Sequence, residues 1–173
     1  MIKLGCIDPT QNSLPEFESA CKLMRKMRKH DAMCIIKTWV NSWTTSYRYR
    51  ETPRLTCLLG CQSHKDCLSH YLDCPQLQRI LEDLLIEPPS SPLAKAGLDQ
   101  VSRESMYTTA AIFAGYHSVK RSHFVNGLDA SPLNFEQTIC AQRLFAQAFQ
   151  VAADDMNLPC RSAGRFVFFS DQC

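Results

Sequence analysis

The stretch from Cys57 to Cys74 reads CLLGCQSHKDCLSHYLDC, and it decides how this chain folds. It offers Cys57, Cys61, His70 and Cys74 in the spacing C-x3-C-x8-H-x3-C. Zinc prefers four tetrahedral thiolate or imidazole ligands, often two from a tight turn and two from a helix. Gly60 permits the turn, and residues four apart, such as His70 and Cys74, share one face of a helix. The spacing therefore predicts a structural Zn²⁺ site.

Two further candidate ligands, His64 and Cys67, lie inside the same stretch. Cys67 stands three residues before His70 and seven before Cys74, so on a helix it would share their face. We favour the first four residues because they form two complete pairs, although His64 or Cys67 could replace one of them. If no metal binds, the cysteines are ordinary reduced thiols and His70 is a histidine on a helix surface.

Ten cysteines among 173 residues raise the alternative of a disulfide-bonded secreted protein. Residues 1–15 contain no apolar stretch after a basic start, so they do not resemble a secretory signal. Clustered Cys and His in a chain that is not secreted are metal ligands more often than disulfides. We therefore expect an intracellular protein, which could act in the nucleus. No apolar run approaches the ~18 residues of a membrane span, so no membrane partner is expected.

The formal net charge of +2 is unevenly distributed. Residues 1–56 contain ten Lys and Arg against five Asp and Glu, whereas residues 57–173 contain nine against twelve. The basic part indicates an anionic partner, with RNA or DNA as the first candidate. Aromatic side chains among the cations could stack on unpaired bases, although we expect Trp39 and Trp43 to be core residues. The residues expected to contact phosphates are Lys22, Arg25, Lys26, Arg28, Lys29, Arg48, Arg50 and Arg54.

Apolar residues at helical spacing predict a mainly α-helical chain. Ser13 and Glu16 match a capping box at the start of the first helix, and Ser131-Pro132 is expected to start the last one. The last two helices should pack as an antiparallel hairpin. The ranges predicted to be helical are 14–30, 32–47, 75–86, 102–126 and 132–156, of which 32–47 could also be a strand because of its β-branched residues.

The clearest interruption is Glu87-Pro-Pro-Ser-Ser-Pro92, which cannot propagate a helix and predicts a linker. The predicted fold class is mainly α, with a small zinc-stapled Cys/His segment plus a helical hairpin. The expected segments are a leader (1–12), basic helices with the zinc-binding segment at 57–75 (13–87), a Pro/Ser linker (88–100), a helical hairpin (101–160) and a tail (161–173) with a short strand or an unsupported end at 165–169.

One run of residues resembles a known family. It comprises Thr38-Trp-Val-Asn-Ser-Trp-Thr-Thr-Ser46, Arg48, the Cys57–Cys61 turn and Asp66-Cys-Leu-Ser-His-Tyr-Leu-Asp-Cys-Pro75. This pattern resembles the zinc-binding region that follows the polymerase domain in reverse transcriptases of non-LTR retrotransposons. The matching residues are Cys57, Cys61, Asp66, Leu68, His70, Cys74 and Pro75, and the resemblance covers about residues 30–85. The helical part after Pro92 looks like the C-terminal continuation of such chains.

The resemblance implies a fragment or remnant of a retroelement polyprotein and does not imply polymerase activity. Polymerisation needs carboxylates that hold two Mg²⁺ ions, and the family supplies them from an aromatic-x-Asp-Asp turn. The only adjacent aspartates are Asp154-Asp155, which follow a helical pattern and lack the aromatic residue. His117 has no recognisable nucleophile beside it, so a structural role is expected. We therefore expect no enzyme.

Three functions fit these observations. The first is a non-catalytic nucleic-acid-binding, zinc-stabilised remnant of a reverse transcriptase polyprotein. The alternative is a zinc-stabilised protein-interaction module that binds a partner helix and no nucleic acid. The third is a non-functional reading frame that still folds in part. The sequence identifies no particular protein partner.

Overall fold

The computed structural model describes residues 13–122 and 131–161, which form eight helices and no β-strand. The expected leader, the residues Asn126-Gly127 and the 165–169 segment lie outside these residues. The prediction of a helix over 102–126 is wrong at its end, because the helix stops at Arg121 and Ser122 is extended. The mainly helical prediction is confirmed. The helices are α1 (Ser13–Met24), α2 (Lys29–Trp39), α3 (Ser46–Tyr49), α4 (Leu68–Asp73), α5 (Pro75–Leu84), α6 (Pro92–Lys95), α7 (Arg103–Arg121) and α8 (Phe135–Met156).

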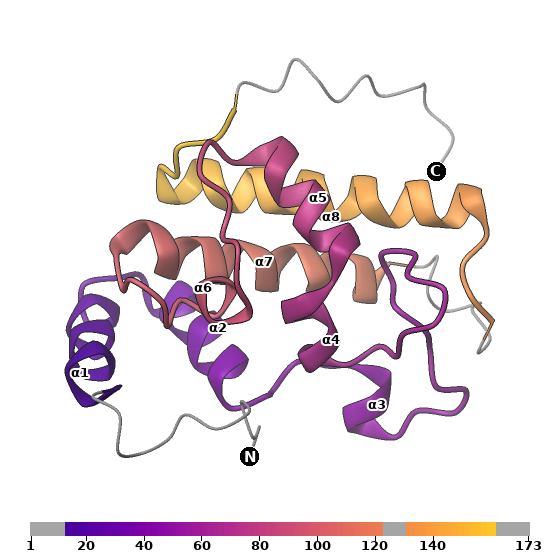
Figure 1. The fold of residues 1–173 in the computed structure, drawn as a ribbon, viewed down its shortest axis with the longest axis horizontal. Helices are drawn as coiled ribbons and strands as arrows, with labels where there is room; N and C mark the ends of the chain where they lie inside the picture. The colour runs from indigo at the N-terminus through magenta and orange to yellow at the C-terminus, as the bar shows by residue number, and fades with distance from the viewer. Residues whose placement is uncertain (1–12, 123–130, 162–173) are drawn as a thin grey trace.

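The two longest helices, α7 and α8, lie side by side and run antiparallel along the molecule (Figure 1). They approach so closely at Gly115 that a Cβ there would lie 2.7 Å from the Phe145 ring. Both Phe145 and Phe149 of α8 are buried against α7. This arrangement confirms the predicted helical hairpin and provides the frame against which the shorter helices pack.

The start of α8 differs from the prediction, which placed it at Pro132. The helix begins at Phe135, because Asn134 caps it in a reciprocal capping box with Gln137. The Asn134 side chain accepts a hydrogen bond from the Gln137 amide at 2.8 Å, and the Gln137 side chain accepts one from the Asn134 amide at 2.9 Å. Pro132 therefore precedes the helix.

The prediction of one helix over residues 14–30 is wrong, because α1 ends at Met24 and α2 begins at Lys29. Asp31 was expected to precede the second helix, but it lies in the first turn of α2, fully buried. The Arg28 guanidinium donates to the Asp31 carboxylate at 2.7 Å and lies 3.5 Å from Asp155 at the end of α8. These contacts fix where α2 starts.

The second predicted helix, over 32–47, is also shorter than predicted. It is an α-helix and not the alternative strand. Helix α2 ends at Trp39, and Asn41 takes the left-handed conformation (φ 53°) that commonly follows a helix end. The expected helix over 32–47 therefore stops eight residues early. A separate short helix, α3, begins after Thr45, whose hydroxyl accepts a hydrogen bond from the Arg48 amide at 3.3 Å.

The expected Pro/Ser linker contains a short helix. Helix α6 starts at Pro92 after Ser91, whose hydroxyl accepts from the Ala94 amide at 3.0 Å. Lys95 and Ala96 are buried at its end, so this segment packs on the rest of the molecule. Helix α5 ends two residues before the predicted Ile86.

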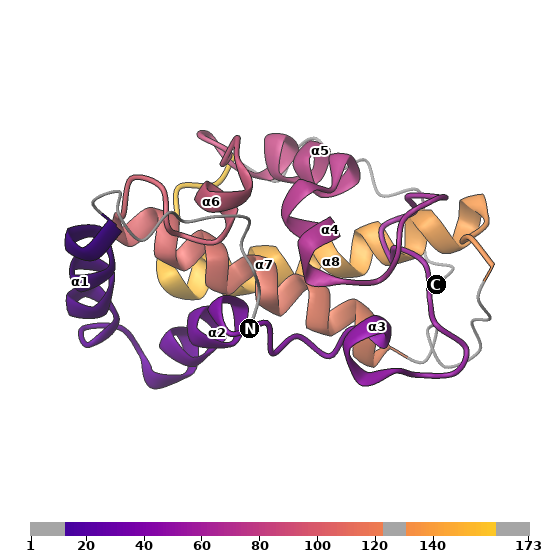
Figure 2. The same cartoon turned by 60° about the horizontal axis from the view of Figure 1, so that its bottom comes forward.

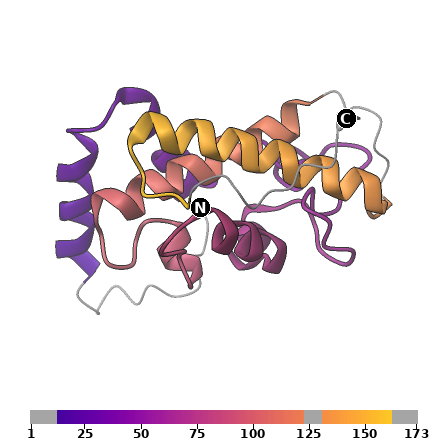
Figure 3. The ribbon, with the colours of Figure 1, turned by 90° about the horizontal axis from the view of Figure 1, so that it is seen from above.

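The short helices divide between the ends and the middle of the hairpin. Helices α1 and α3 lie at opposite ends of the molecule (Figures 1 and 2), and α1 is at the end of the molecule where α8 finishes (Figure 3). At the centre, the buried Trp43 ring lies 4.7 Å from the ring of Tyr116 and 5.9 Å from that of Tyr71. Trp43 is thus a core residue, as expected.

Within the described ranges, no helix has the length and apolar character needed to cross a bilayer.

Candidate metal centre

The turn around Gly60 supplies the first two candidate ligands. Gly60 has φ +94°, a conformation that L side chains rarely adopt, and its amide donates to the Cys57 carbonyl at 3.1 Å. A Cβ at Gly60 would also overlap with the side chain of Thr138 on α8. The Cys57 amide donates to the His64 carbonyl at 2.8 Å. The turn therefore places Cys57 and Cys61 on one small loop that packs against α8.

The second pair of candidate ligands comes from α4 and its junction with α5. His70 lies in α4, and Cys74 is both the C-cap of α4 and the N-cap of α5. The Cys74 sulfur accepts a hydrogen bond from the Leu77 amide at 3.4 Å. Pro75 occupies the first position of α5, where a missing N–H costs no helical hydrogen bond.

These four residues form a compact group, named here the Cys3His cluster: Cys57, Cys61, His70 and Cys74. Their ligand atoms all lie within 4.8 Å of one another. The Cys74 sulfur is 3.9 Å from that of Cys57 and 3.5 Å from that of Cys61. A tetrahedral zinc site with Zn–S bonds of 2.3 Å separates its sulfurs by about 3.8 Å. The spacing of the sulfurs thus fits a zinc ion.

The imidazole of His70 completes the donor set. Its Nε2 atom is buried and has no hydrogen-bond partner among the described residues. A buried ring nitrogen without a partner is costly, and a metal ion would satisfy it. The chemistry of three thiols and one imidazole is that of structural zinc sites. The buried group could therefore hold a metal ion such as zinc.

The cluster already favours a negatively charged sulfur. The pKa of Cys74 is lowered to about 4, chiefly because the Cys57 thiol hydrogen-bonds to its sulfur, and His70 adds to the effect. The same hydrogen bond raises the pKa of Cys57, which holds the shared proton. Burial raises the pKa of Cys61 to about 11. Zinc requires deprotonated thiols, so the lowered pKa of Cys74 favours metal binding.

A buried lysine from α6 lies near the cluster. The Lys95 ammonium donates to the Leu72 carbonyl of α4 at 3.0 Å. Burial lowers the pKa of Lys95, while the nearby Cys74 sulfur favours its charged form. Three thiolates, one imidazole and Zn²⁺ carry a net charge of −1. A lysine in this position would offset that charge if zinc were bound.

The two residues considered as replacement ligands lie outside the cluster. The Cys67 sulfur contacts the Ser69 hydroxyl at 3.3 Å, just before α4 begins. The exposed His64 ring stacks on the His70 ring, with centroids 4.5 Å apart and planes 16° apart. His64 therefore covers the candidate ligand His70 from the outside.

Asp66 forms a second buried centre beside the cluster. Its carboxylate accepts hydrogen bonds from the Ser46 amide at 2.6 Å and from the hydroxyls of Tyr71 at 2.9 Å and Tyr116 at 3.1 Å. The Lys120 ammonium lies 3.6 Å away. Burial and the Asp66 charge raise the pKa of both tyrosines, so their hydroxyls keep the protons that they donate.

This network connects to the cysteine turn, because the Leu58 amide donates to the Tyr71 hydroxyl at 3.0 Å. Asp66 thereby links α3, α4 and α7 to the loop that carries Cys57 and Cys61. The sequence singled out Asp66 only through the family resemblance. Nothing local in the sequence indicates its partners on α7, because they lie 50 residues or more away along the chain.

The expected phosphate-binding residues are divided between two places. Lys22, Arg25, Lys26, Arg28 and Lys29 are exposed at the end of α1 and the turn into α2, whereas Arg48, Arg50 and Arg54 are exposed in and after α3. These places lie at opposite ends of the molecule (Figure 2), so the residues do not form one basic face. Arg28 is also engaged with Asp31 and Asp155.

The cations around α3 are ordered by two exposed tyrosines. Arg54 and Lys65 lie over the Tyr47 ring at 5.0 and 4.9 Å from its centroid, and Arg48 lies over Tyr49 at 5.0 Å. Lys65 was missed in the sequence, because the bridge between Thr56 and Lys65 brings it to this surface. The residues Tyr47, Arg48, Tyr49, Arg54 and Lys65 are named here the α3 surface.

His117 lies outside both sites. Its side chain is only 7% exposed, and Nδ1 lies 3.2 Å from the Thr44 hydroxyl. Burial, together with the charges of Arg121 and Lys37, lowers the pKa of His117 to about 4. The ring packs on Phe113, with centroids 4.0 Å apart. These surroundings are those of a neutral core histidine.

This burial predicts an acid-sensitive fold. Between pH 6.5 and 4 the unfolded chain protonates His117 and the folded chain does not, so stability falls as the pH drops through 6.5, with a slope that approaches about 1.4 kcal/mol per pH unit. Urea unfolding of the wild type and His117→Gln from pH 7.5 to 5.5 measures this, with exposed His30→Gln as control. As the pH falls, the wild type and the control should lose stability faster than His117→Gln. The Cys3His cluster is the same in all three proteins. Equal slopes for all three would refute this role of His117.

Asp154 and Asp155 are both exposed at the end of α8. Asp154 accepts a hydrogen bond from Gln150 at 2.7 Å, and Asp155 pairs with Arg28. Their partners are those of a solvated helix end.

In the comparisons with known proteins, no family model, no curated protein and no solved structure matches this chain.

Proposed function

We propose that the Cys3His cluster binds a structural Zn²⁺ ion. Support comes from one observation above all: the four candidate ligand atoms lie within 4.8 Å of one another. Cys57, Cys61, His70 and Cys74 would hold the ion and fill all four tetrahedral positions. Such a site leaves no place for a water or a substrate, so its contribution is to folding. The proposed role is therefore non-catalytic, in a protein that works inside the cell where thiols stay reduced.

We further propose that the α3 surface binds the phosphate backbone of RNA or DNA. Its three cations come from α3, from the loop after it and from the cysteine turn, and the two tyrosines hold them together. The three cations are exposed and already cover the tyrosine rings, which suits phosphate contacts better than base stacking. Zinc at the neighbouring cluster would fix the turn that carries Lys65.

The family resemblance supports this function. Within the resembling segment, Leu68 is buried, Asp66 holds three helices together and Pro75 starts α5. Each of these matching residues thus has a structural role close to the Cys3His cluster. The proposal is that this chain is a non-catalytic remnant of a retroelement reverse transcriptase polyprotein. The runner-up is a protein-interaction module without nucleic-acid binding, which the outer face of α2 favours, as argued below.

Nucleic-acid binding should depend on salt and on the α3 surface. Each phosphate contacted in a single strand gives a slope of about −0.7 in log affinity against log salt. We expect the variant Arg48→Ala/Arg54→Ala/Lys65→Ala to bind a single-stranded RNA or DNA oligonucleotide more weakly, with a slope shallower by about two. Fluorescence anisotropy between about 50 and 200 mM salt measures both quantities.

Arg103→Ala is the matched control, because Arg103 also lies over an aromatic ring, that of Tyr107, at 5.2 Å but on α7. It should leave affinity and slope unchanged. Wild-type affinity that does not respond to salt, or equal losses in the control and the triple variant, would refute the proposed interface and favour the runner-up.

A further inference from the structure

The outward side of α2 is apolar. Met33, Ile36 and Val40 are 48%, 37% and 56% exposed and are named here the α2 outer face. Their spacing confines them to about 60° of the helix surface. The opposite side of α2 carries its buried residues, including Asp31 and Thr38. The α2 outer face is therefore a continuous stripe of apolar side chains that the described protein leaves uncovered.

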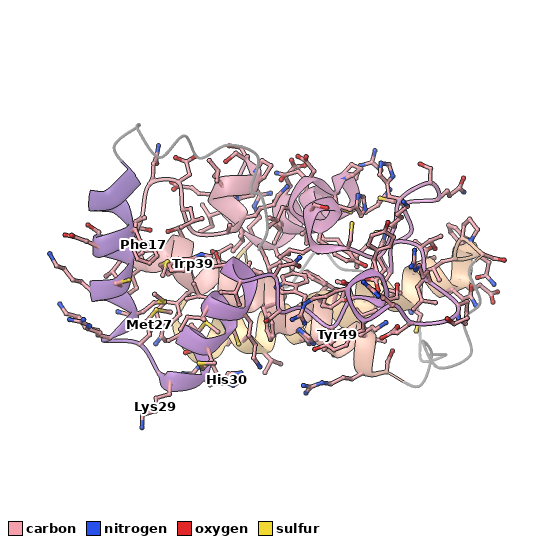
Figure 4. The ribbon with its side chains drawn as sticks, turned by 90° about the horizontal axis from the view of Figure 1, so that it is seen from below. Phe17, Met27, Lys29, His30, Trp39 and Tyr49 are labelled. Atoms are coloured by element: carbon pink, nitrogen blue, oxygen red, sulfur yellow. The ribbon has the colours of Figure 1, made fainter. Side chains whose placement is uncertain are left out.

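An aromatic contact joins α1 to α2. The Phe17 ring of α1 is half exposed and lies 5.8 Å from the Trp39 ring of α2. Met27, in the turn between the two helices, is partly buried against the core. Figure 4 shows Phe17, Trp39 and Met27 along the space between α1 and α2. Flexible Met side chains and exposed aromatic rings are common at surfaces that bind protein segments.

The charges on and around α2 are mostly positive, although Glu18 is exposed next to Phe17 on α1. From residue 19 to residue 50 the only acidic residue is Asp31, and it is buried and paired with Arg28. Lys29 lies on the outward side of α2 itself, and Lys37 leans over Phe113 of α7 at 5.6 Å beside the stripe. The remaining exposed cations of the rim are Lys22, Arg25 and Lys26.

We propose that the α2 outer face binds an acidic amphipathic helix of a protein partner. Its apolar side would cover the three apolar residues, and its carboxylates would meet the cations of the rim. Apolar side chains at i, i+3 and i+7 match the stripe of a second helix in such a pairing. A nucleic acid would leave Met33, Ile36 and Val40 without apolar contacts, so a protein fits better. This proposal does not depend on the zinc ion or on the α3 surface.

The test uses a labelled synthetic helix of about 18 residues built from Leu and Glu with one apolar stripe. Fluorescence anisotropy with the full chain should show binding to this peptide. A scrambled peptide of the same composition should bind at least about tenfold more weakly, because its apolar residues do not form a stripe. The variant Ile36→Ser/Val40→Ser should weaken binding about tenfold or more, and Lys29→Glu/Lys37→Glu should weaken it most at low salt.

The matched control is Leu93→Ser/Val151→Ser, which removes two exposed apolar side chains, 41% and 66% exposed, from α6 and α8. It should leave peptide binding unchanged. The test variant should still melt cooperatively and keep its affinity for RNA, which separates this result from unfolding and from failure of the α3 surface. No peptide binding, equal binding of the scrambled peptide, or equal losses in test and control variants would overturn the proposal. Binding to phosphatidylserine vesicles with loss in the Ile36/Val40 variant, but none to the peptide, would assign the face to a membrane surface instead.

Discussion

Replacing Cys74 with serine is expected to abolish zinc binding and to unfold the region around the cysteine turn. The Cys74 sulfur lies 3.9 Å from that of Cys57 and 3.5 Å from that of Cys61, and Cys74 joins α4 to α5. Structural zinc contributes about 10–16 kcal/mol of apparent binding free energy in zinc-finger peptides. Loss of one of four ligands removes most of this energy and leaves buried thiols and His70 without partners. Metal analysis and thermal melting of the purified variant measure both effects.

Cys67→Ser is the matched control, because Cys67 lies in the same segment but outside the Cys3His cluster. It should retain zinc and the wild-type melting temperature. If Cys74→Ser does not yield folded protein, chelation of the wild type supplies the second measurement: stability should fall and should return with Zn²⁺ but not with Mg²⁺. Full zinc content and unchanged melting in Cys74→Ser, or no response to the chelator, would contradict the expectation.

Asp66→Ala should produce the largest loss of stability that is independent of metal ligation. The substitution leaves the hydroxyls of Tyr71 and Tyr116 and the amide of Ser46 without their acceptor, and it leaves Lys120 with only Glu51, at 2.6 Å. Removing one member of a buried charged network costs about 3–5 kcal/mol. Urea unfolding at neutral pH measures this loss as the change in the free energy of unfolding.

Asp83→Ala provides the comparison, because Asp83 is an exposed aspartate on α5. A surface substitution of this kind is expected to change stability by about 0.5 kcal/mol or less. If Asp66→Ala and Asp83→Ala destabilise the protein equally, the network around Asp66 does not hold α3, α4 and α7 together. A loss of zinc in Asp66→Ala would further show that the network supports the cysteine turn.

The parts of the structure that were predicted correctly are those that local sequence determines. The spacing of Cys57, Cys61, His70 and Cys74 depends on one turn and one short helix, and the structure brings these four side chains together. The α7–α8 hairpin follows from long amphipathic patterns, which is why its existence was predictable and the start of α8 was off by three residues.

The basic N-terminal half was predicted less well, because tertiary contacts decide it. Arg28 precedes α2 without a side-chain cap, so no local pattern marks the break between α1 and α2. The position of α2 depends on the ion pairs of Arg28 with Asp31 and with Asp155, 127 residues away. Lys65 reaches the α3 surface and Lys95 approaches the cluster only when the chain is folded. The spacing of residues along the sequence does not predict contacts of this kind.

X-ray absorption spectroscopy at the zinc edge, on chain purified without added metal, tests the central claim most directly. The account predicts one zinc ion per chain, bound by three sulfurs at about 2.3 Å and one nitrogen at about 2.0 Å. Absence of zinc, a shell of oxygen and nitrogen only, or four sulfurs without nitrogen would contradict the assignment of Cys57, Cys61, His70 and Cys74 as the ligands.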